Sequence, residues 1–223
     1  MRNLALMWVL AGVAVALLAA GDGKPPVPTF TDERDGKVYK IVKIGSQTWM
    51  AQNLNYAAKG SKCYDNKAEN CAKYGRLYSW DAAMKACPAG FHVPSFVEWD
   101  TLEEFVGDEG FEAGRKLKST IGWDDWKGKS GNGTDEYGFS ALPGGGTLGT
   151  LGEPFTNTTG KRGDWWSATE TEYCIDDQGN CFWDHAKSRG MGCYDGLLTW
   201  CYAAKGLFMS LRCVQDDEKE KRK

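Results

Sequence analysis

Apolar and polar residues alternate from Val38 to Ile44 (VYKIVKI), a spacing that predicts a β-strand because successive side chains point to opposite faces. Gly45-Ser46 interrupts this pattern, and apolar residues resume in QTWMAQNL, so the two runs together predict a β-hairpin. Near the C-terminus, LLTWCYAAKGLFMSLRCVQD predicts two further strands joined near Lys205-Gly206. We expect the N-terminal and C-terminal strands to pair in one small antiparallel sheet.

Helical patterns occupy the region after this hairpin. A first helix is predicted to begin at Ser79 in SWDAAMKAC and to end at Pro88. A third, short helix is predicted from Phe111 in FEAGRKLKS. The short helices and the small sheet together predict an α+β domain.

The second predicted helix carries the clearest start signal. Ser95 and Glu98 form an S-x-x-E capping box, in which the hydroxyl and the carboxylate each accept from a free backbone N–H group. Trp99 then opens a series of apolar residues at helical spacing, and Gly107 ends it. His92 lies in an extended segment just before this cap, so we interpret it as a structural histidine.

From Thr120 to Asp164 the chain is rich in glycine and shows no helical periodicity. Phe139–Leu142 and Trp165–Thr169 are predicted as short buried strands within or beside this region. Because neighbouring residues on a strand face opposite sides, one of Trp165 and Trp166 is expected in the core and the other at the surface. A long loop inside a compact domain is usually functional.

The first residues of the chain have the layout of a secretory signal peptide. One positive charge is followed by an uncharged apolar run from Leu4 to Ala20 and then by small residues. An uncleaved N-terminal anchor is the alternative. We therefore divide the chain into a signal peptide or anchor (1–20), a Pro-rich linker (21–36), a domain (37–216) and a charged tail (217–223).

Eight cysteines follow the predicted leader, and an even count behind an export signal predicts disulfides, because the compartment is oxidising. The predicted pairs are Cys63–Cys71 and Cys174–Cys181 as short loops, Cys87–Cys213 as a long one, and Cys193–Cys201 by elimination. No short Cys-x-x-Cys or His-x-His pair is present, so no zinc site is predicted. The formal net charge of −3 gives no reason to expect binding to nucleic acid, and a membrane would be contacted only through an uncleaved leader.

Five ordered blocks resemble the Fibrobacter succinogenes major paralogous domain family, which occurs on exported bacterial proteins. The blocks lie at 38–56, 74–102, 137–145, 164–170 and 208–216. Parts of them are also similar to C-type-lectin-like domains and to sulfatase modifiers of the formylglycine-generating kind. This resemblance implies a C-type-lectin-like fold, with helices on a small sheet made by both termini and long functional loops, in a protein that is secreted, periplasmic or at the cell surface.

Two departures from these relatives bear on function. Where sugar-binding lectins place a calcium-ligating oxygen, this sequence has Phe155, in Glu153-Pro154-Phe155. The lectin-type Ca²⁺ motif is therefore missing and no cofactor is predicted, with calcium kept as an alternative. The surroundings of Cys193 and Cys201 do not match the late cysteine pair of formylglycine-generating enzymes.

Aromatic residues beside carboxylates supply the candidate binding groups, because indole rings stack on sugar faces while carboxylates accept hydrogen bonds from hydroxyls. The candidates are Trp123, Asp124, Asp125, Trp126, Trp183 and Asp184. The competing interpretation of the first four is a tight acidic turn between two partly buried indoles. His185, beside Asp184, is interpreted as a strand or surface histidine, since no serine motif accompanies it.

No complete catalytic set emerges from the sequence. The leading hypothesis is an exported, non-catalytic module that binds carbohydrate or a cell-surface protein through the loops at 121–163 and 170–205. The alternatives are a structural envelope protein without a ligand and an enzyme of the formylglycine-generating kind.

Overall fold

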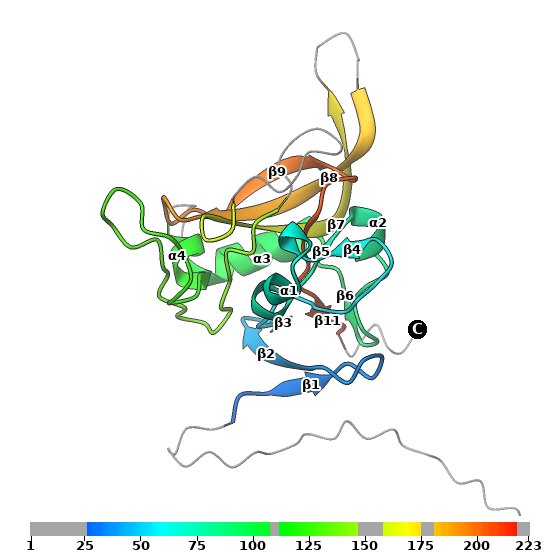
Figure 1. Ribbon diagram of the computed structural model, residues 1–223, viewed down its shortest axis with the longest axis horizontal. Coiled ribbons are helices and arrows are strands. Elements are labelled where there is room, and N and C mark those ends of the chain that lie inside the picture. Colours follow the sequence, from blue (N-terminus) through cyan, green and yellow to red (C-terminus); the bar gives the residue numbers. More distant parts are fainter. Residues whose placement is uncertain (1–25, 108–111, 147–157, 175–180, 218–223) are drawn as a thin grey trace, which may run out of the picture.

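The computed structural model describes residues 26–107, 112–146, 158–174 and 181–217, with the side chains of 173, 174 and 181–183 outside the description. Two sheets and several short helices give the α+β architecture that the sequence predicts (Figure 1). The predicted leader (1–20) lies outside the described residues. Within the described ranges, no helix combines the length and the apolar character that crossing a bilayer requires.

The first sheet joins both ends of the domain, as predicted. It also includes a strand at Thr29–Thr31, from the stretch predicted as a linker (21–36), so the folded domain begins earlier than predicted. The strand order of this sheet is β1-β2-β3-β11-β6, and all the pairings are antiparallel. The strands are β1 (Thr29–Thr31), β2 (Val38–Ile44), β3 (Gln47–Met50), β6 (Phe91–His92) and β11 (Val214–Gln215). The predicted hairpin is confirmed by the pairing of Ile44 with Gln47, and Val214 lies opposite Trp49.

The second sheet is larger and was not predicted as a separate unit. Its order is β4-β5-β10-β7-β8-β9, with β10 parallel to β7 and the other pairs antiparallel. The strands are β4 (Ser61–Lys62), β5 (Leu77–Tyr78), β7 (Arg162–Cys174), β8 (Cys181–Gly192), β9 (Thr199–Ala204) and β10 (Met209–Ser210). The outer ends of β7 and β8 project from the body as a ribbon (Figure 1).

The two strands predicted on either side of Lys205-Gly206 are present, but they do not pair with each other as a hairpin. β9 pairs with β8, whereas β10 lies between β5 and β7. Met209 and Leu211 are fully or almost fully buried. The chain therefore enters the middle of the sheet after the turn, because burying these apolar side chains is more favourable than returning along the exposed edge.

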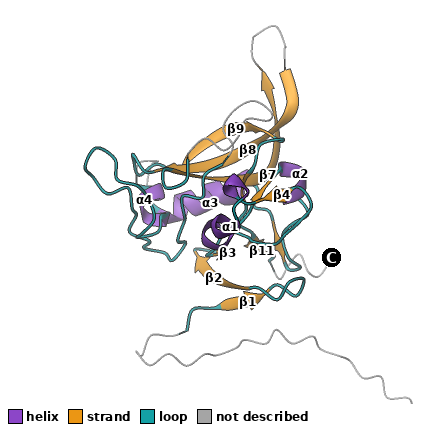
Figure 2. Cartoon of the chain, viewed as in Figure 1, coloured by secondary structure: helices purple, strands orange, loops and turns teal. Residues whose placement is uncertain are grey.

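The helices are short, and α3 is the longest of those described. They are η1 (Tyr64–Asn66), α1 (Ala68–Tyr74), α2 (Trp80–Ala83), α3 (Phe96–Val106) and α4 (Ala113–Leu117). The capping box of α3 is confirmed, with both the Ser95 and the Glu98 hydrogen bonds present. α2 and α4 are shorter than predicted, and α1 was not predicted. α3 packs between β2 of the first sheet and β7 and β8 of the second (Figure 2).

The predicted strand at Phe139–Leu142 is wrong, since only an isolated bridge joins Ala141 to Lys118. Ser140 has a φ of 53°, a left-handed conformation that interrupts an extended strand. The Asp135 carboxylate holds Ser140 in place by accepting from its backbone N–H at 2.7 Å and from its hydroxyl at 2.5 Å.

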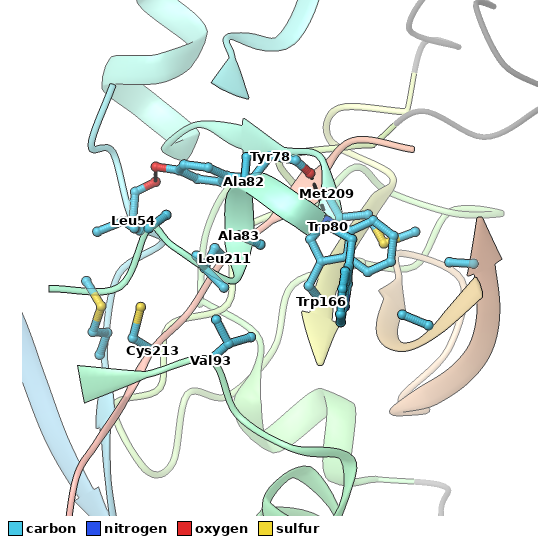
Figure 3. Packing of buried hydrophobic residues seen from close by; sticks show 14 of the residues in the cluster. Leu54, Tyr78, Trp80, Ala82, Ala83, Val93, Trp166, Met209, Leu211 and Cys213 are labelled. Atoms are coloured by element: carbon cyan, nitrogen blue, oxygen red, sulfur yellow. Dashed lines mark hydrogen bonds between the residues drawn. The ribbon is translucent and has the colours of Figure 1, made fainter. Parts of the chain in front are cut away.

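Trp165 and Trp166 are both fully buried, which corrects the prediction that one reaches the surface. Trp165 belongs to a cluster with Trp49, Trp99 and Phe139, and Trp166 belongs to a second cluster with Tyr78 and Trp80. Figure 3 shows the second cluster, where the indole N–H of Trp166 donates to the carbonyl of Tyr78 at 2.8 Å. Side chains therefore cover both faces of β7, and alternation along the strand places each indole in a different core.

Two of the predicted disulfides are present. Cys63–Cys71 spans Cα atoms 5.0 Å apart, and Cys87–Cys213 spans 5.9 Å. Cys174 and Cys181 are Cα partners in the β7–β8 register, but their side chains lie outside the described residues.

The predicted Cys193–Cys201 disulfide is wrong, because both cysteines are free. The β8–β9 register places Cys201 opposite Ser188, five residues before Cys193. At the rise of an extended strand this offset is roughly 16 Å. A disulfide tolerates a Cα separation of about 7 Å at most.

Candidate functional site

A cavity of about 400 Å³ lies between the predicted loop 121–163 and the β8–β9 connection. We call it the loop pocket. Its lining residues are Arg115, Lys118, Trp126, Lys127, Lys129, Ser130, Asn132, Cys193, Tyr194 and Asp195. Residues from both predicted loops therefore contribute to one concave surface. Most of 170–205 is not a loop as predicted but forms strands of the second sheet, and its lining residues come from the turn after β8.

Trp126 is presented to solvent by a tight turn. Its backbone exchanges hydrogen bonds with Lys129, at 2.8 Å and 3.0 Å. The two residues between them, Lys127 (φ 49°) and Gly128 (φ 76°), both have positive φ, the signature of a type I′ turn. This turn leaves the indole of Trp126 47% exposed.

Tyr194 stands beside Trp126 on the other wall of the pocket. The two rings meet edge to face, with centroids 6.2 Å apart, and Tyr194 is 49% exposed. A Cβ atom at Gly192 would collide with the Tyr194 ring, so glycine at this position lets the ring pack back over the strand. The pair forms an aromatic platform at the mouth of the loop pocket.

Trp123 anchors the loop from below. Its side chain is 3% exposed, and its indole N–H donates to the carbonyl of Ala141 at 3.0 Å. The backbone N–H of Trp123 donates to the Asn132 side-chain oxygen at 2.9 Å. Trp123 therefore belongs to the core, which corrects its selection as a binding residue.

Lys118 connects the two walls of the pocket. Its ammonium donates to the carbonyls of Gly192 and Asp195, both at 2.9 Å, and lies 5.0 Å from the Trp123 ring centroid. Burial lowers the pKa of this lysine, because removal from water disfavours the charged form. The side chain is 2% exposed, so a buried cation forms the floor of the loop pocket.

The remaining predicted residues do not all gather at this pocket. Asp124 and Asp125 are exposed next to Trp126 but do not line the cavity. Asp184 is exposed on β8, eight residues and therefore about 26 Å along the strand from Gly192. The side chain of Trp183 and the Glu153-Pro154-Phe155 segment lie outside the described residues.

Sequence reasoning missed Tyr194 and Lys118. Tyr194 directly follows Cys193 in GMGCYDG, in the turn after β8, and only the folded chain brings it next to Trp126. From the sequence alone, Lys118 is indistinguishable from an ordinary surface lysine at the end of a short helix.

A second group of aromatic residues was also missed, on the edge strand β9. Trp200 is 50% exposed and contacts Tyr202 at 5.3 Å and Phe96 at 6.1 Å between ring centroids. The ammonium of Lys187 lies 4.2 Å from the Phe96 centroid. Alternation places Trp200 and Tyr202 on one face of β9, a signal that the sequence TWCYAA does contain.

The free thiols differ in environment. Cys193 is a buried wall residue of the loop pocket, where burial raises its thiol pKa, with Asp124 adding to the effect. Cys201 is exposed on β9. No group of three or more His, Cys, Asp or Glu side chains is placed to hold a metal ion in the part of the chain that the structure describes.

His92 lies away from the loop pocket, and its contacts fit the structural role predicted for it. Its Nε2 atom lies 2.7 Å from a Glu98 oxygen and its Nδ1 atom 2.7 Å from an Asp216 oxygen. The Glu98 contact, followed by the Asp216 contact, raises the pKa of His92 to about 9, so both ring N–H groups donate at neutral pH. The imidazolium thereby ties the cap of α3 to the residue that follows β11.

Comparison with known proteins agrees with the resemblance seen in the sequence. No curated protein and no solved structure matches the chain. The family model described as Fibrobacter succinogenes major domain matches residues 42–215, which include the second sheet, the loop pocket and the first sheet from Val42 onward. The chain therefore belongs to the Fibrobacter succinogenes major domain family.

Proposed function

We propose that this domain is an exported, non-catalytic module that binds carbohydrate at the loop pocket. The observation that carries the proposal is the half-exposed Trp126–Tyr194 pair at the mouth of a cavity of about 400 Å³. Exposed aromatic rings on a rigid support stack on the apolar faces of sugars with little loss of side-chain entropy. The buried Trp123 and the type I′ turn provide that support.

Export is supported by the two disulfides, which are typical of oxidising compartments outside the cytoplasm. The C-type-lectin-like architecture implied by the resemblance belongs to this proposal too. The pairing of β3 near the N-terminus with β11 near the C-terminus supports it.

The test is retention of the purified, oxidised protein on insoluble plant and bacterial polysaccharides, with and without a chelator. We expect retention that does not depend on the chelator and that is lost in Trp126→Ala. Trp200→Ala is the matched control, because it removes an equally exposed indole outside the loop pocket. Loss of retention in both variants alike, or retention by none of the polymers, would contradict the proposal.

A second candidate is binding of a protein partner at the β9 surface. Trp200 and Tyr202 favour it, because exposed aromatic residues are enriched in protein interfaces, and Phe96 of α3 supports the Trp200 ring from the side. A crosslinking experiment on intact cells, comparing the wild type with Trp200→Ala, tests it. Crosslinked adducts of equal amount in the wild type and in Trp200→Ala would contradict a role for this surface.

The enzyme alternative gains little from the free thiols. The late cysteine pair of formylglycine-generating enzymes would require Cys193 and Cys201 to act together, whereas the β8–β9 register separates them. A structural envelope role without a ligand gives no reason for an exposed aromatic pair at a cavity. Both remain alternatives to the proposed binding module.

A further inference from the structure

The lining of the loop pocket carries an excess of positive charge. Among the described residues that line it, four side chains are cationic (Arg115, Lys118, Lys127 and Lys129) and one, Asp195, is acidic. The protein as a whole has a formal net charge of −3. The loop pocket is therefore opposite in sign to the average surface.

Two of the acidic groups near the pocket, Asp195 and Glu112, are engaged in other contacts, whereas Asp124 and Asp125 are exposed beside Trp126 and offset part of the positive charge. The Asp195 carboxylate accepts from the backbone N–H of Leu197 at 3.1 Å. Glu112 forms an ion pair with Arg115 along α4 and offsets that cation. The cations that line the mouth are therefore Lys127 and Lys129 of the Trp126 turn, whereas Asp124 and Asp125 on the same loop lie outside the lining.

Lys118 strengthens this potential from the floor. Its two hydrogen-bond partners are backbone carbonyls, so its positive charge is met by dipoles and not by a bonded carboxylate. In a partly dehydrated site, such a charge acts on a bound anion with less screening than a surface lysine does. A cation that is 2% exposed is also held in place before any ligand arrives.

We infer that the loop pocket selects an acidic saccharide, with sugar rings stacked on Trp126 and Tyr194 and a carboxylate directed at the lysines. This inference rests on the proposed function and names its ligand class, a carboxylated polysaccharide. Neutral polymers also present sugar rings that stack on the two aromatic residues, but they have no carboxylate for the lysines, so they are bound more weakly.

The test compares two polymers with the same sugar backbone, polygalacturonate and its fully methyl-esterified form, in which each carboxylate is replaced by an uncharged ester. The method is affinity gel electrophoresis of the full chain at low and high salt. We expect about tenfold tighter binding to the acid form at low salt, a preference that shrinks as salt screens the charges. The double variant Lys127→Gln/Lys129→Gln should lose about tenfold in affinity for the acid form alone. The matched control is Lys59→Gln/Lys85→Gln, which removes two exposed lysines that lie near β4 and α2, on the other side of Figure 1 from α4.

The possible outcomes separate the inference from the proposed function. Equal binding of both polymers that is lost in Trp126→Ala would overturn the charge selectivity and leave the carbohydrate module standing. An equal loss in the two double variants would also overturn the inference, because net charge and not the pocket would be responsible. Binding of neither polymer, nor of any neutral glycan, would overturn the proposed function itself.

Discussion

The Asn53 side-chain oxygen accepts a hydrogen bond from the indole N–H of Trp165 at 2.8 Å, between residues far apart in the sequence. The same oxygen accepts from the guanidinium of Arg212 at 3.2 Å, and the Asn53 amide donates to the Tyr74 carbonyl at 2.9 Å. Arg212 is fully buried, and burial lowers its pKa to about 9. Asn53 therefore holds together the polar groups where β3, β7 and the final segment meet.

We expect Asn53→Ala to lower the free energy of unfolding by about 3 kcal/mol or more, because it leaves buried donors on Trp165 and Arg212 without an acceptor. Asn55→Ala is the matched control, since the Asn55 backbone N–H keeps its bond to the Tyr39 hydroxyl at 3.0 Å. The Asn55→Ala variant should lose less than about 1 kcal/mol of unfolding free energy. Denaturant unfolding followed by tryptophan fluorescence measures both, and equal costs would argue against the special role of Asn53.

His92 predicts a pH dependence of stability. Its folded-state pKa of about 9 lies above the ordinary value of 6.5, so the protonated form is stabilised by folding. The stabilisation is complete below about pH 6.5 and is lost as the pH rises through 9. His92 is 35% exposed, so we discount the shift for solvent screening and expect about 1–2 kcal/mol.

The measurement is the difference in unfolding free energy between the wild type and His92→Gln at pH 6, 8 and 10. Using the difference removes the titration of the other groups. The difference in unfolding free energy should be largest at pH 6 and close to zero at pH 10. A difference that does not change with pH would mean that His92 acts through packing and not through its charge.

The two disulfides should contribute unequally. Cys87–Cys213 closes a loop with a sequence separation of 126, and Cys63–Cys71 one of 8. In the chain-entropy model, the longer loop stabilises the folded protein by about 5 kcal/mol and the shorter one by about 2.5 kcal/mol. We expect Cys87→Ala/Cys213→Ala to destabilise the protein more than Cys63→Ala/Cys71→Ala in guanidinium unfolding under non-reducing conditions, and the opposite order would contradict this account.

Local features of the fold could be predicted from sequence because their causes are local. The hairpin at Gly45-Ser46 and the capping box of Ser95 and Glu98 each depend on residues within a few positions. The burial of both Trp165 and Trp166 could not be predicted, because it depends on distant segments covering both faces of β7. The position of β10 between β5 and β7 is set in the same non-local way.

The candidate site also contains residues that local sequence predicts and residues that depend on distant segments. Trp126 was predicted from its aromatic and acidic neighbours, and it does reach solvent. Its partner Tyr194 depends on a turn after β8, and the burial of Trp123 depends on the carbonyl of Ala141. Many residues of the five family blocks form the cores and polar contacts, including Trp49, Trp99 and Arg212, whereas Trp126, Tyr194 and Trp200 lie outside those blocks.

Trp123 and Trp126 should differ sharply in their effects on stability. Trp123→Ala removes a core indole and should cost about 3–5 kcal/mol. Trp126→Ala removes a half-exposed ring and should cost about 1 kcal/mol or less. Thermal and denaturant unfolding of the two variants measures this contrast, and similar costs would show that the Trp126 turn is part of the core.

The two free thiols should react at different rates in the native protein. Cys201 is exposed and should be alkylated by iodoacetamide within minutes, whereas Cys193 is buried, with a pKa raised by desolvation, and should react only after unfolding. Mass-spectrometric mapping of the labelled peptides identifies which cysteine reacts. Cys201→Ser serves as the control, because it should abolish the fast reaction at this position. A Cys193–Cys201 peptide linked by a disulfide in the non-reduced digest would contradict the β8–β9 register, which holds the two cysteines apart.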